Sequence, residues 1–143
     1  MIAREWKTSD IPKIAELEKQ CFSDPWPEES FEGSIDSPFF YGILFEEGGQ
    51  VCAYACEMVV FEDAEILNVA VAPSFRRQGL GVKLLLALEA YAKENGAERL
   101  LLEVREGNVF ARGLYEKQGF SSFGIRKNYY EDGENAVVMQ KTI

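Results

Sequence analysis

The sequence contains no histidine among its 143 residues. Histidine is the usual proton acceptor beside a catalytic serine or cysteine and the commonest ligand of protein-bound metals. Its absence excludes Ser-His-Asp and Cys-His catalysis and most zinc chemistry. Any acid–base chemistry in this protein must therefore use glutamate, aspartate, tyrosine, lysine or cysteine.

Cysteine is scarce as well, with only Cys21, Cys52 and Cys56 present. An odd number of cysteines without a Cys-x-x-Cys pair indicates neither a disulfide framework nor a zinc site, and we expect no bound metal. Cys52 and Cys56 are four residues apart in a strand-like run. This spacing predicts two small buried side chains on the same face of a strand.

Long hydrophobic runs are also missing. No apolar stretch approaches the ~20 residues that a membrane-spanning helix needs. Residues 1–6 lack the charged start, apolar stretch and cleavage site of a secretory signal, so we expect a cytoplasmic protein. A chain of 143 residues fits one domain, 1–143, which can bury roughly 70% of the surface of its unfolded state.

Positive charge is in deficit, with 15 basic against 24 acidic residues and a net charge of −9. Such a surface repels the phosphates of nucleic acids and anionic lipids, so neither is an expected partner. It would attract a basic protein or peptide. Acidity that only keeps the protein soluble explains the charge equally well.

Periodicity and turn residues predict strands alternating with helices. The order of these elements, strands first and then alternating strands and helices, predicts a mixed sheet with helices packed against it, an α+β arrangement. Ser9 and Asp10 are expected to cap the first helix. Strands are expected at 1–6, 39–45, 51–61, 64–71, 99–104, 120–126 and 136–142, and helices at 10–22, 27–34, 79–95 and 108–119.

Two glycines lie where a buried strand is followed by a long amphipathic helix, in the segment 69–81. Free backbone N–H groups at a helix start bind anions, and glycine lets a phosphate come close. The two arginines at 76–77 oppose the helix dipole unless a polyanion lies between them. We therefore predict anion binding here. A surface arginine pair beside an ordinary tight turn is the plain alternative.

A single carboxylate, Glu103, interrupts the apolar run 100–104. Burying a carboxylate is costly unless it has a partner or a use. Strand alternation places Leu101, Glu103 and Arg105 on one face. Glu103 can act as a general base, or it can form a structural ion pair with Arg105 or another cation.

Residues 108–119 predict a helix that Asn108 caps and that presents its apolar side to the core. Tyr115 lies beside that side, where a tyrosine that only packs in the core is the plain alternative. A phenol with a pKa of about 10 can nonetheless protonate a departing thiolate, whose conjugate acid has a pKa of about 8.5. Gly113, in the middle of this helix, should cost about 1 kcal/mol relative to alanine, and close packing would be one reason for it.

Together these segments resemble the GNAT superfamily of N-acetyltransferases. Residues 76–81 match its pyrophosphate loop, Arg/Gln-x-x-Gly-x-Gly/Ala. More narrowly, nearly the whole chain resembles the RimI-type bacterial ribosomal-protein N-terminal alanine acetyltransferases. The motifs that carry this narrower resemblance are Asp24-Pro25-Trp26, Leu67-Asn68-Val69-Ala70-Val71, Leu102-Glu103-Val104-Arg105 with Asn108, Leu114-Tyr115-Glu116 with Gly119-Phe120, and Arg126-Lys127-Asn128-Tyr129-Tyr130 with Glu134 and Ala136.

The resemblance implies a GNAT fold, a mostly antiparallel twisted sheet of about seven strands flanked by about four helices. It implies transfer of an acetyl group from acetyl-coenzyme A to the N-terminal α-amino group of a protein, a ribosomal protein beginning with alanine. Two alternatives keep the same fold. One is an acetyltransferase for lysine or a small amine, and the other is a non-catalytic acetyl-coenzyme A-binding module.

The resemblance also implies where acetyl-coenzyme A would bind. The backbone of 69–71 would bind the pantetheine arm and the acetyl carbonyl, and Arg77 through Val82, with Arg76, would hold the pyrophosphate. Asn108 would contact the coenzyme further along. The complete implied set is Val69, Ala70, Val71, Arg76, Arg77, Gln78, Gly79, Leu80, Gly81, Val82 and Asn108.

For the reaction itself, the resemblance implies that Glu103 is the general base, acting through water, and that Tyr115 is the general acid toward the coenzyme A thiolate. Trp26, Tyr129 and Tyr130 would flank the groove that admits the acceptor. An α-amino group with a pKa of about 8 is roughly 10% neutral at pH 7, whereas lysine is neutral less than about 0.1% of the time. This difference favours an N-terminus. The chain departs from the family only near its end, with Glu134-Asn135 where Glu-Asp is frequent.

Overall fold

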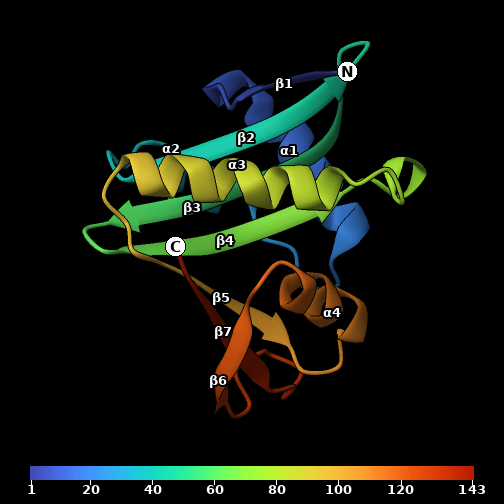
Figure 1. Cartoon of the computed structure of the whole chain (residues 1–143). Coiled ribbons are helices and arrows are strands. Elements are labelled where there is room, and N and C mark those ends of the chain that lie inside the picture. Colours follow the sequence, from blue (N-terminus) through green and yellow to red (C-terminus); the bar gives the residue numbers. More distant parts are fainter.

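A computed structural model describes all of residues 1–143. It has one seven-stranded sheet in the order β1-β2-β3-β4-β5-β7-β6, with helices on both faces (Figure 1). Only β4 and β5 pair in parallel, so the predicted mixed, mostly antiparallel sheet with four α-helices is confirmed. The elements are β1 (Ile2–Glu5), α1 (Ile11–Cys21), α2 (Glu28–Ile35), β2 (Phe40–Glu47), β3 (Gln50–Val60), β4 (Asp63–Val71), α3 (Leu80–Glu94), β5 (Arg99–Arg105), α4 (Val109–Lys117), β6 (Ser121–Arg126) and β7 (Ala136–Thr142), with 3-10 turns at Thr8–Asp10 and Pro73–Phe75.

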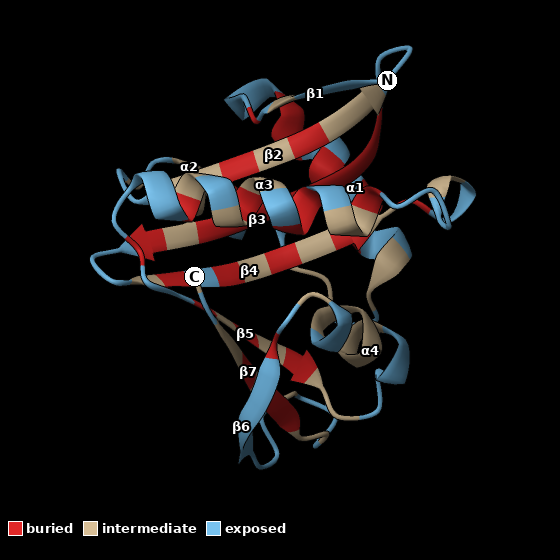
Figure 2. Ribbon diagram, viewed as in Figure 1, coloured by how far each residue is buried: buried red, intermediate tan, exposed pale blue.

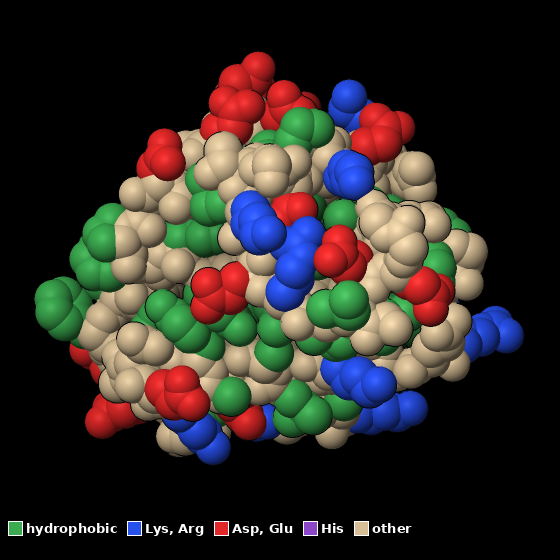
Figure 3. Space-filling model, turned by 90° about the horizontal axis from the view of Figure 1, so that it is seen from above, with side chains coloured by type: hydrophobic (Ala, Val, Ile, Leu, Met, Phe, Trp, Pro, Cys, Tyr) green, Lys and Arg blue, Asp and Glu red, His purple; other side chains and the backbone are tan.

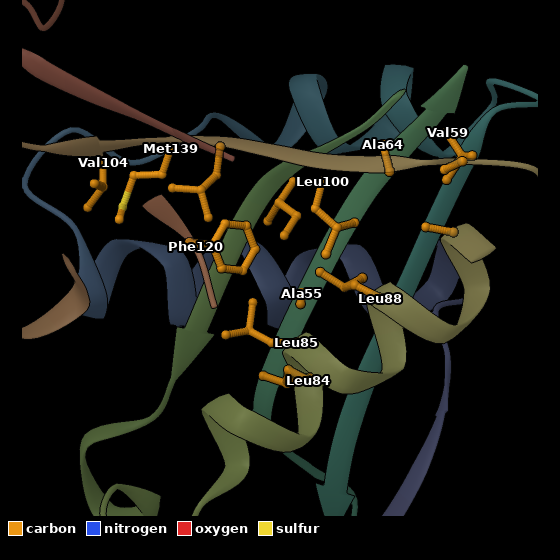
Figure 4. Close-up of a cluster of buried hydrophobic side chains, with 14 of the residues drawn as sticks. Ala55, Val59, Ala64, Leu84, Leu85, Leu88, Leu100, Val104, Phe120 and Met139 are labelled. Carbon is orange, nitrogen blue, oxygen red and sulfur yellow. The ribbon is translucent and has the colours of Figure 1, made fainter. Parts of the chain in front are cut away.

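The sheet separates two hydrophobic clusters. One lies under α3 and α4, and the other under α1 and α2. In the first, Leu84, Leu85 and Leu88 on α3 point toward the sheet (Figure 4). Each buried leucine contributes about 2 kcal/mol relative to an exposed one, which fixes α3 on the sheet. Figure 2 shows buried positions along the inner strands, whereas β6 is exposed along its length.

The two parallel strands separate along their length, and this positions the functional site. β4 and β5 pair only from Asp63↔Arg99 to Glu65↔Leu101. A β-bulge at Leu67, where β3 pairs with residues 66 and 68, lies just beyond the last of these pairs. The carboxyl ends of β4 and β5 therefore diverge (Figure 1), leaving the backbone of 67–71 without a strand beside it on that edge.

The prediction that Cys52 and Cys56 lie on the same face of a strand is wrong, because a second β-bulge lies at Cys52. Cys52 packs in the cluster under α3, whereas Cys56 packs in the cluster under α1 and α2. The register of β2 and β3 shifts between Phe45 and Glu46, and Cys52 is the residue without a partner there. The extra residue reverses the strand's alternation, so two cysteines four apart face opposite sides.

The predicted side-chain cap of α1 is also wrong. Asp10 occupies the N-cap position, but its carboxylate makes no cap hydrogen bond to the helix. It accepts instead from the backbone N–H of Lys7 at 2.7 Å and from Arg4 at 2.8 Å. Arg4 also bonds Glu46 at 2.9 Å, so the acid ties β1 to the start of α1. Figure 3, which views the molecule from above relative to Figure 1, shows acidic and basic side chains beside one another on this face.

Candidate active site

A cavity of about 520 Å³ opens at the carboxyl end of β4. Its walls come from β4, the loop that follows it, the start of α3, and α4. Every residue of the predicted coenzyme set except Gln78 lines it, and Tyr115 lines it too. Gln78 is exposed in the loop and does not line the cavity. The cavity walls are mostly hydrophobic, with polar groups at the loop, which suits a long ligand with an anionic segment.

The loop before α3 is built for an anion. Gly79 has φ +78 and Arg77 has φ +65, a conformation in which successive N–H groups turn toward one concave side. The N–H of Lys83 donates to the Gly79 carbonyl at 3.1 Å, so the N–H groups of 80–82 precede the first helical hydrogen bond. The first turn carries no acidic residue. Left-handed geometry at a non-glycine residue costs about 1 kcal/mol or more, strain that proteins retain at binding sites.

The two arginines of this loop have different partners. Arg76 donates from Nε to the Val71 carbonyl at 3.1 Å and from Nη2 to the Cys21 sulfur at 3.8 Å. It therefore ties the loop to the end of β4 and to α1. Arg77 makes no ion pair or side-chain hydrogen bond within the chain, so its charge is available to a ligand.

Helix α4 forms the opposite wall. The predicted cap is confirmed, since Asn108 Oδ1 accepts from the N–H of Ala111 at 3.1 Å. Tyr115 packs edge-on against Phe120 with the ring centroids 5.7 Å apart. Burial, and secondly the nearby Tyr130, raises the pKa of Tyr115 to about 12. The phenol therefore remains protonated at neutral pH and can donate a proton into the cavity.

Glu103 lies on the other face of the sheet from the α3 cluster. The neighbouring Leu102 and Val104 are buried in that cluster, while the Glu103 side chain is 21% exposed. Its carboxylate forms an ion pair with Arg126, with Nε and Oε1 3.0 Å apart. The alternative of a structural ion pair is thus realised, with Arg126 in place of Arg105. The same carboxylate is the largest cause of a raised pKa at Tyr129.

The loop that carries Trp26 is held by a buried acid. Glu18 is only 2% exposed, and its Oε2 accepts from the N–H of Trp26 at 2.9 Å. The carboxylate also accepts from the Tyr54 hydroxyl and from Asn68 Nδ2, the latter at 3.1 Å. Glu18 therefore fastens this loop to β3 and to the irregular part of β4.

Sequence reasoning missed several residues of the site. Glu18 occupies an ordinary position in an amphipathic helix, and only its contacts with residues 36 and 50 positions away identify it. The apolar cavity residues outside the predicted set also give no local signal. They are Cys21, Phe22, Phe75, Phe110, Ala111 and Leu114.

Comparison with known proteins agrees with this geometry. The family model described as the acetyltransferase (GNAT) family matches residues 11–120. The chain belongs to this family. A relative from Bacillus subtilis (strain 168) is 39% identical over 142 residues, covering 98% of this chain and 94% of its own. The [ribosomal protein bS18]-alanine N-acetyltransferase of Escherichia coli (strain K12) is 37% identical, covering 93% of this chain and 91% of its own.

Solved structures of this GNAT group superpose closely. The crystal structure of the ribosomal-protein-S18-alanine N-acetyltransferase from Escherichia coli has a TM-score of 0.91 at 34% identity, covering 99% of this chain and 93% of that one. Ard1 from Thermoplasma volcanium has a TM-score of 0.90 at 26% identity, covering 99% of this chain and 97% of that one.

None of the helices combines the length and apolar character that crossing a membrane requires.

Family membership makes acetyl-coenzyme A the co-substrate. The cavity residues fit it. The free N–H groups at the start of α3 and the unpaired Arg77 suit the pyrophosphate, and the apolar walls suit the pantetheine arm. These groups provide a local positive site on a protein whose net charge is −9.

Proposed function

We propose that this protein transfers the acetyl group of acetyl-coenzyme A to the N-terminal α-amino group of a protein, and that its natural acceptor is the N-terminal alanine of ribosomal protein bS18. The names of its full-length relatives support this acceptor. The observation that carries the proposal is that Glu103 and Tyr115 lie on opposite faces of the sheet, where β4 and β5 diverge. Only Tyr115 lines the coenzyme cavity. Donor and acceptor would then enter from opposite faces.

In this proposal the thioester lies beside the free edge of β4. Backbone groups of 69–71 on that edge, apart from the Val71 carbonyl that Arg76 binds, would hold the pantetheine arm and stabilise the oxyanion formed on attack. The amine nitrogen bonds to the thioester carbon as its proton passes, through water, to Glu103. Collapse of the tetrahedral intermediate breaks the carbon–sulfur bond. Tyr115 then donates its proton to the departing thiolate.

On the acceptor side, the proposed groove runs between two loops. Trp26 lies in the loop 22–27, and Tyr129 and Tyr130 lie in the loop 127–135. Arg126, the ion-pair partner of Glu103, also lies over Tyr129, with its Cζ 5.8 Å from the ring centroid. A small first residue suits a groove flanked by aromatic rings, and an acidic surface suits a basic acceptor.

A thiol-release assay with two hexapeptides tests the acceptor class. One begins with a free alanine and carries arginines downstream, and the other is N-acetylated and carries an internal lysine. We expect coenzyme A release only with the free N-terminus. Release with the blocked peptide would assign a lysine acceptor, and release with neither peptide, together with retained acetyl-coenzyme A binding, would leave a binding module.

The same assay tests the choice of a basic partner. Raising the ionic strength shortens the range of electrostatic attraction, so kcat/KM for the arginine-containing peptide should fall as salt rises. A matched alanine-initiated peptide without arginines is the control, and its kcat/KM should change little. A flat response with both peptides would restrict the acidic surface to a role in solubility.

A further inference from the structure

Arg105, the last residue of β5, is the point at which two separate loops meet. Its Nη2 lies 2.7 Å from Asp24 Oδ2, in the loop between α1 and α2. Its Nη1 lies 2.9 Å from Asp132 Oδ2 and 2.8 Å from Glu134 Oε1, both in the loop between β6 and β7. The guanidinium also lies over the ring of Tyr130, 4.1 Å from its centroid. One side chain, only 20% exposed, thus binds three carboxylates and an aromatic ring.

The second loop is fitted closely to this arginine. Glu134 uses its other oxygen, Oε2, to accept from the N–H of Gly107 at 2.9 Å. A Cβ at position 107 would lie 2.7 Å from the same oxygen, so any larger residue there would make the Glu134 carboxylate shift. The hydrogen bond from Arg105 lowers the pKa of Glu134. The pKa of Asp132 is lowered mainly by the hydrogen bond from the N–H of Glu134, and secondly by the one from Arg105. Both acids are therefore ionised at neutral pH.

The two loops have no direct hydrogen bond or ion pair between them. The loop 22–27 is otherwise held through the bond of Trp26 to Glu18. The loop 127–135 is also closed by its own bonds, from the N–H of Asn128 to Asn135 and from the N–H of Tyr130 to the Glu134 carbonyl, and its end is held by the N–H groups of Glu106 and Gly107. Arg105 is the residue whose side chain bonds to both loops and so links one to the other.

We propose that Arg105 is a positioning residue that sets the separation of the loops 22–27 and 127–135, and thereby selects the size of the acceptor's first residue. This inference rests on the proposed function, because it takes the space between those loops as the acceptor groove. Arg105 does not line the coenzyme cavity, so its effect is confined to the acceptor. Its planar fork can engage both loops at once, which a lysine cannot reproduce.

Kinetics separate positioning from simple stabilisation. A variant that only loses stability lowers the active fraction, which reduces kcat for every acceptor and leaves KM values and selectivity unchanged. A variant with loosened loops raises KM for the acceptor and narrows the preference for a small first residue over a large one. KM for acetyl-coenzyme A stays as it was, because the coenzyme cavity is not touched.

The experiment compares Arg105→Lys and Arg105→Met with Arg99→Met. Arg99 is the matched control, since it begins the same strand and its exposed ion pair with Asp63, at 2.8 Å, lies at the far end. Peptides beginning with Ala and Leu serve as acceptors. We expect both Arg105 variants to raise KM for the Ala peptide by about 10-fold or more and to reduce the Ala-over-Leu ratio of kcat/KM by a similar factor. Arg99→Met should behave as wild type.

Variants of the partners keep the proposal testable if Arg105→Met folds poorly. Asp24→Asn removes the ion pair between Arg105 and the loop 22–27, and Glu134→Gln removes one of its ion pairs with the loop 127–135. Each should reproduce part of the change in selectivity, and neither should add to the effect of Arg105→Lys, because the residues act as one unit. Full additivity, or an equal loss of kcat with every acceptor, would overturn the proposal.

Hydrogen–deuterium exchange separates this proposal from the proposed function. Amides of 22–27 and 127–135 should both exchange faster in Arg105→Met than in Arg99→Met. Faster exchange in only one loop would contradict the role of Arg105 in joining them. If wild type acetylates neither peptide, the proposed acceptor class fails, and the exchange data still decide whether Arg105 holds the two loops together.

Discussion

Arg126 forms an ion pair with Glu103 across the intervening strand β7, with Nε 3.0 Å from the carboxylate. The pair is partly exposed, with the Arg126 side chain 60% and the Glu103 side chain 21% accessible. Ion pairs this accessible contribute about 0–1 kcal/mol to stability, so the pair does not explain a carboxylate in an apolar strand. The proposed role of Glu103 as a general base would explain it.

Glu103→Gln tests this interpretation. If Glu103 accepts the amine proton, the amide should lower kcat by about 100-fold while changing the free energy of unfolding by less than about 1 kcal/mol. Arg126→Gln removes the other partner and is the matched control, for which kcat should change by only a few-fold. Steady-state kinetics and urea unfolding give both values. Equal losses of activity in the two variants would assign the pair a structural role.

Tyr115→Phe tests the proton donor. The phenol has a pKa raised to about 12 by burial and by Tyr130, so it remains protonated through the alkaline range in which enzymes are assayed. We expect kcat to fall by about 100-fold, with acetyl-coenzyme A affinity retained by calorimetry. In the wild type, activity should not fall near pH 10 through loss of the Tyr115 proton, so the pH–rate profile should have no descending alkaline limb there that is missing from the variant. Such a limb would mean that the phenol titrates at its ordinary pKa.

Gly79→Ala tests the anion loop. Gly79 has φ +78, and a Cβ there would meet no atom within 4 Å, so the cost of alanine is conformational and not steric. We expect about 1 kcal/mol of lost stability and a higher KM for acetyl-coenzyme A, with KM for the acceptor unchanged. Gly79→Asn should retain more affinity, because asparagine tolerates left-handed geometry better. A KM for acetyl-coenzyme A that stays at the wild-type value would show that this geometry is not needed.

The elements of this fold could be predicted from the sequence to within a few residues, because each has a strong local signal. Asn108 illustrates this, since a capping residue precedes a run at helical spacing and the predicted bond to Ala111 forms. The strand alternation around Glu103 is equally local. The loop 76–81 could also be predicted as a candidate anion site, because its glycines and arginines are adjacent in the chain.

What could not be predicted depends on contacts between distant segments. Glu103 pairs with Arg126 and not with Arg105 because β7 pairs with both β5 and β6 and places β6 one strand away, an arrangement that no local pattern encodes. Cys52 turns away from the face of Cys56 because of one extra residue in β3. Arg105 joins residues 81 positions and 29 positions away, and neither spacing leaves a periodic trace (105 − 24 and 134 − 105).

Gly113→Ala tests the remaining glycine of the site region. Close packing does not account for it, because a Cβ at position 113 would meet no atom within 4 Å. Its backbone is helical, within α4, so alanine should stabilise the protein by about 1 kcal/mol. Thermal unfolding measures this gain. KM for acetyl-coenzyme A should not change, since Gly113 does not line the cavity, and a rise in KM would place this backbone against the coenzyme.

Glu57→Gln tests a buried acid that the mechanism does not use. Glu57 on β3 is 0% exposed, both carboxylate oxygens lack hydrogen-bond partners, and burial raises its pKa to about 8. The folded state therefore holds the proton more tightly than the unfolded chain, whose value is near the ordinary 4.5. It follows that the contribution of Glu57 to stability is fully present below pH 4.5 and is lost as pH rises toward 8, by up to about 5 kcal/mol.

Glutamine mimics the protonated acid and does not titrate, so this contribution should vanish in the variant. We expect wild type and Glu57→Gln to have similar urea midpoints at pH 5, and the variant to be more stable at pH 8.5. Glu65→Gln on β4 is the matched control, because Glu65 is exposed and its amide should leave the pH dependence of the midpoint unchanged. If wild type and Glu57→Gln keep parallel pH profiles, the carboxylate is ionised in the folded protein and has a partner that neutralises its cost.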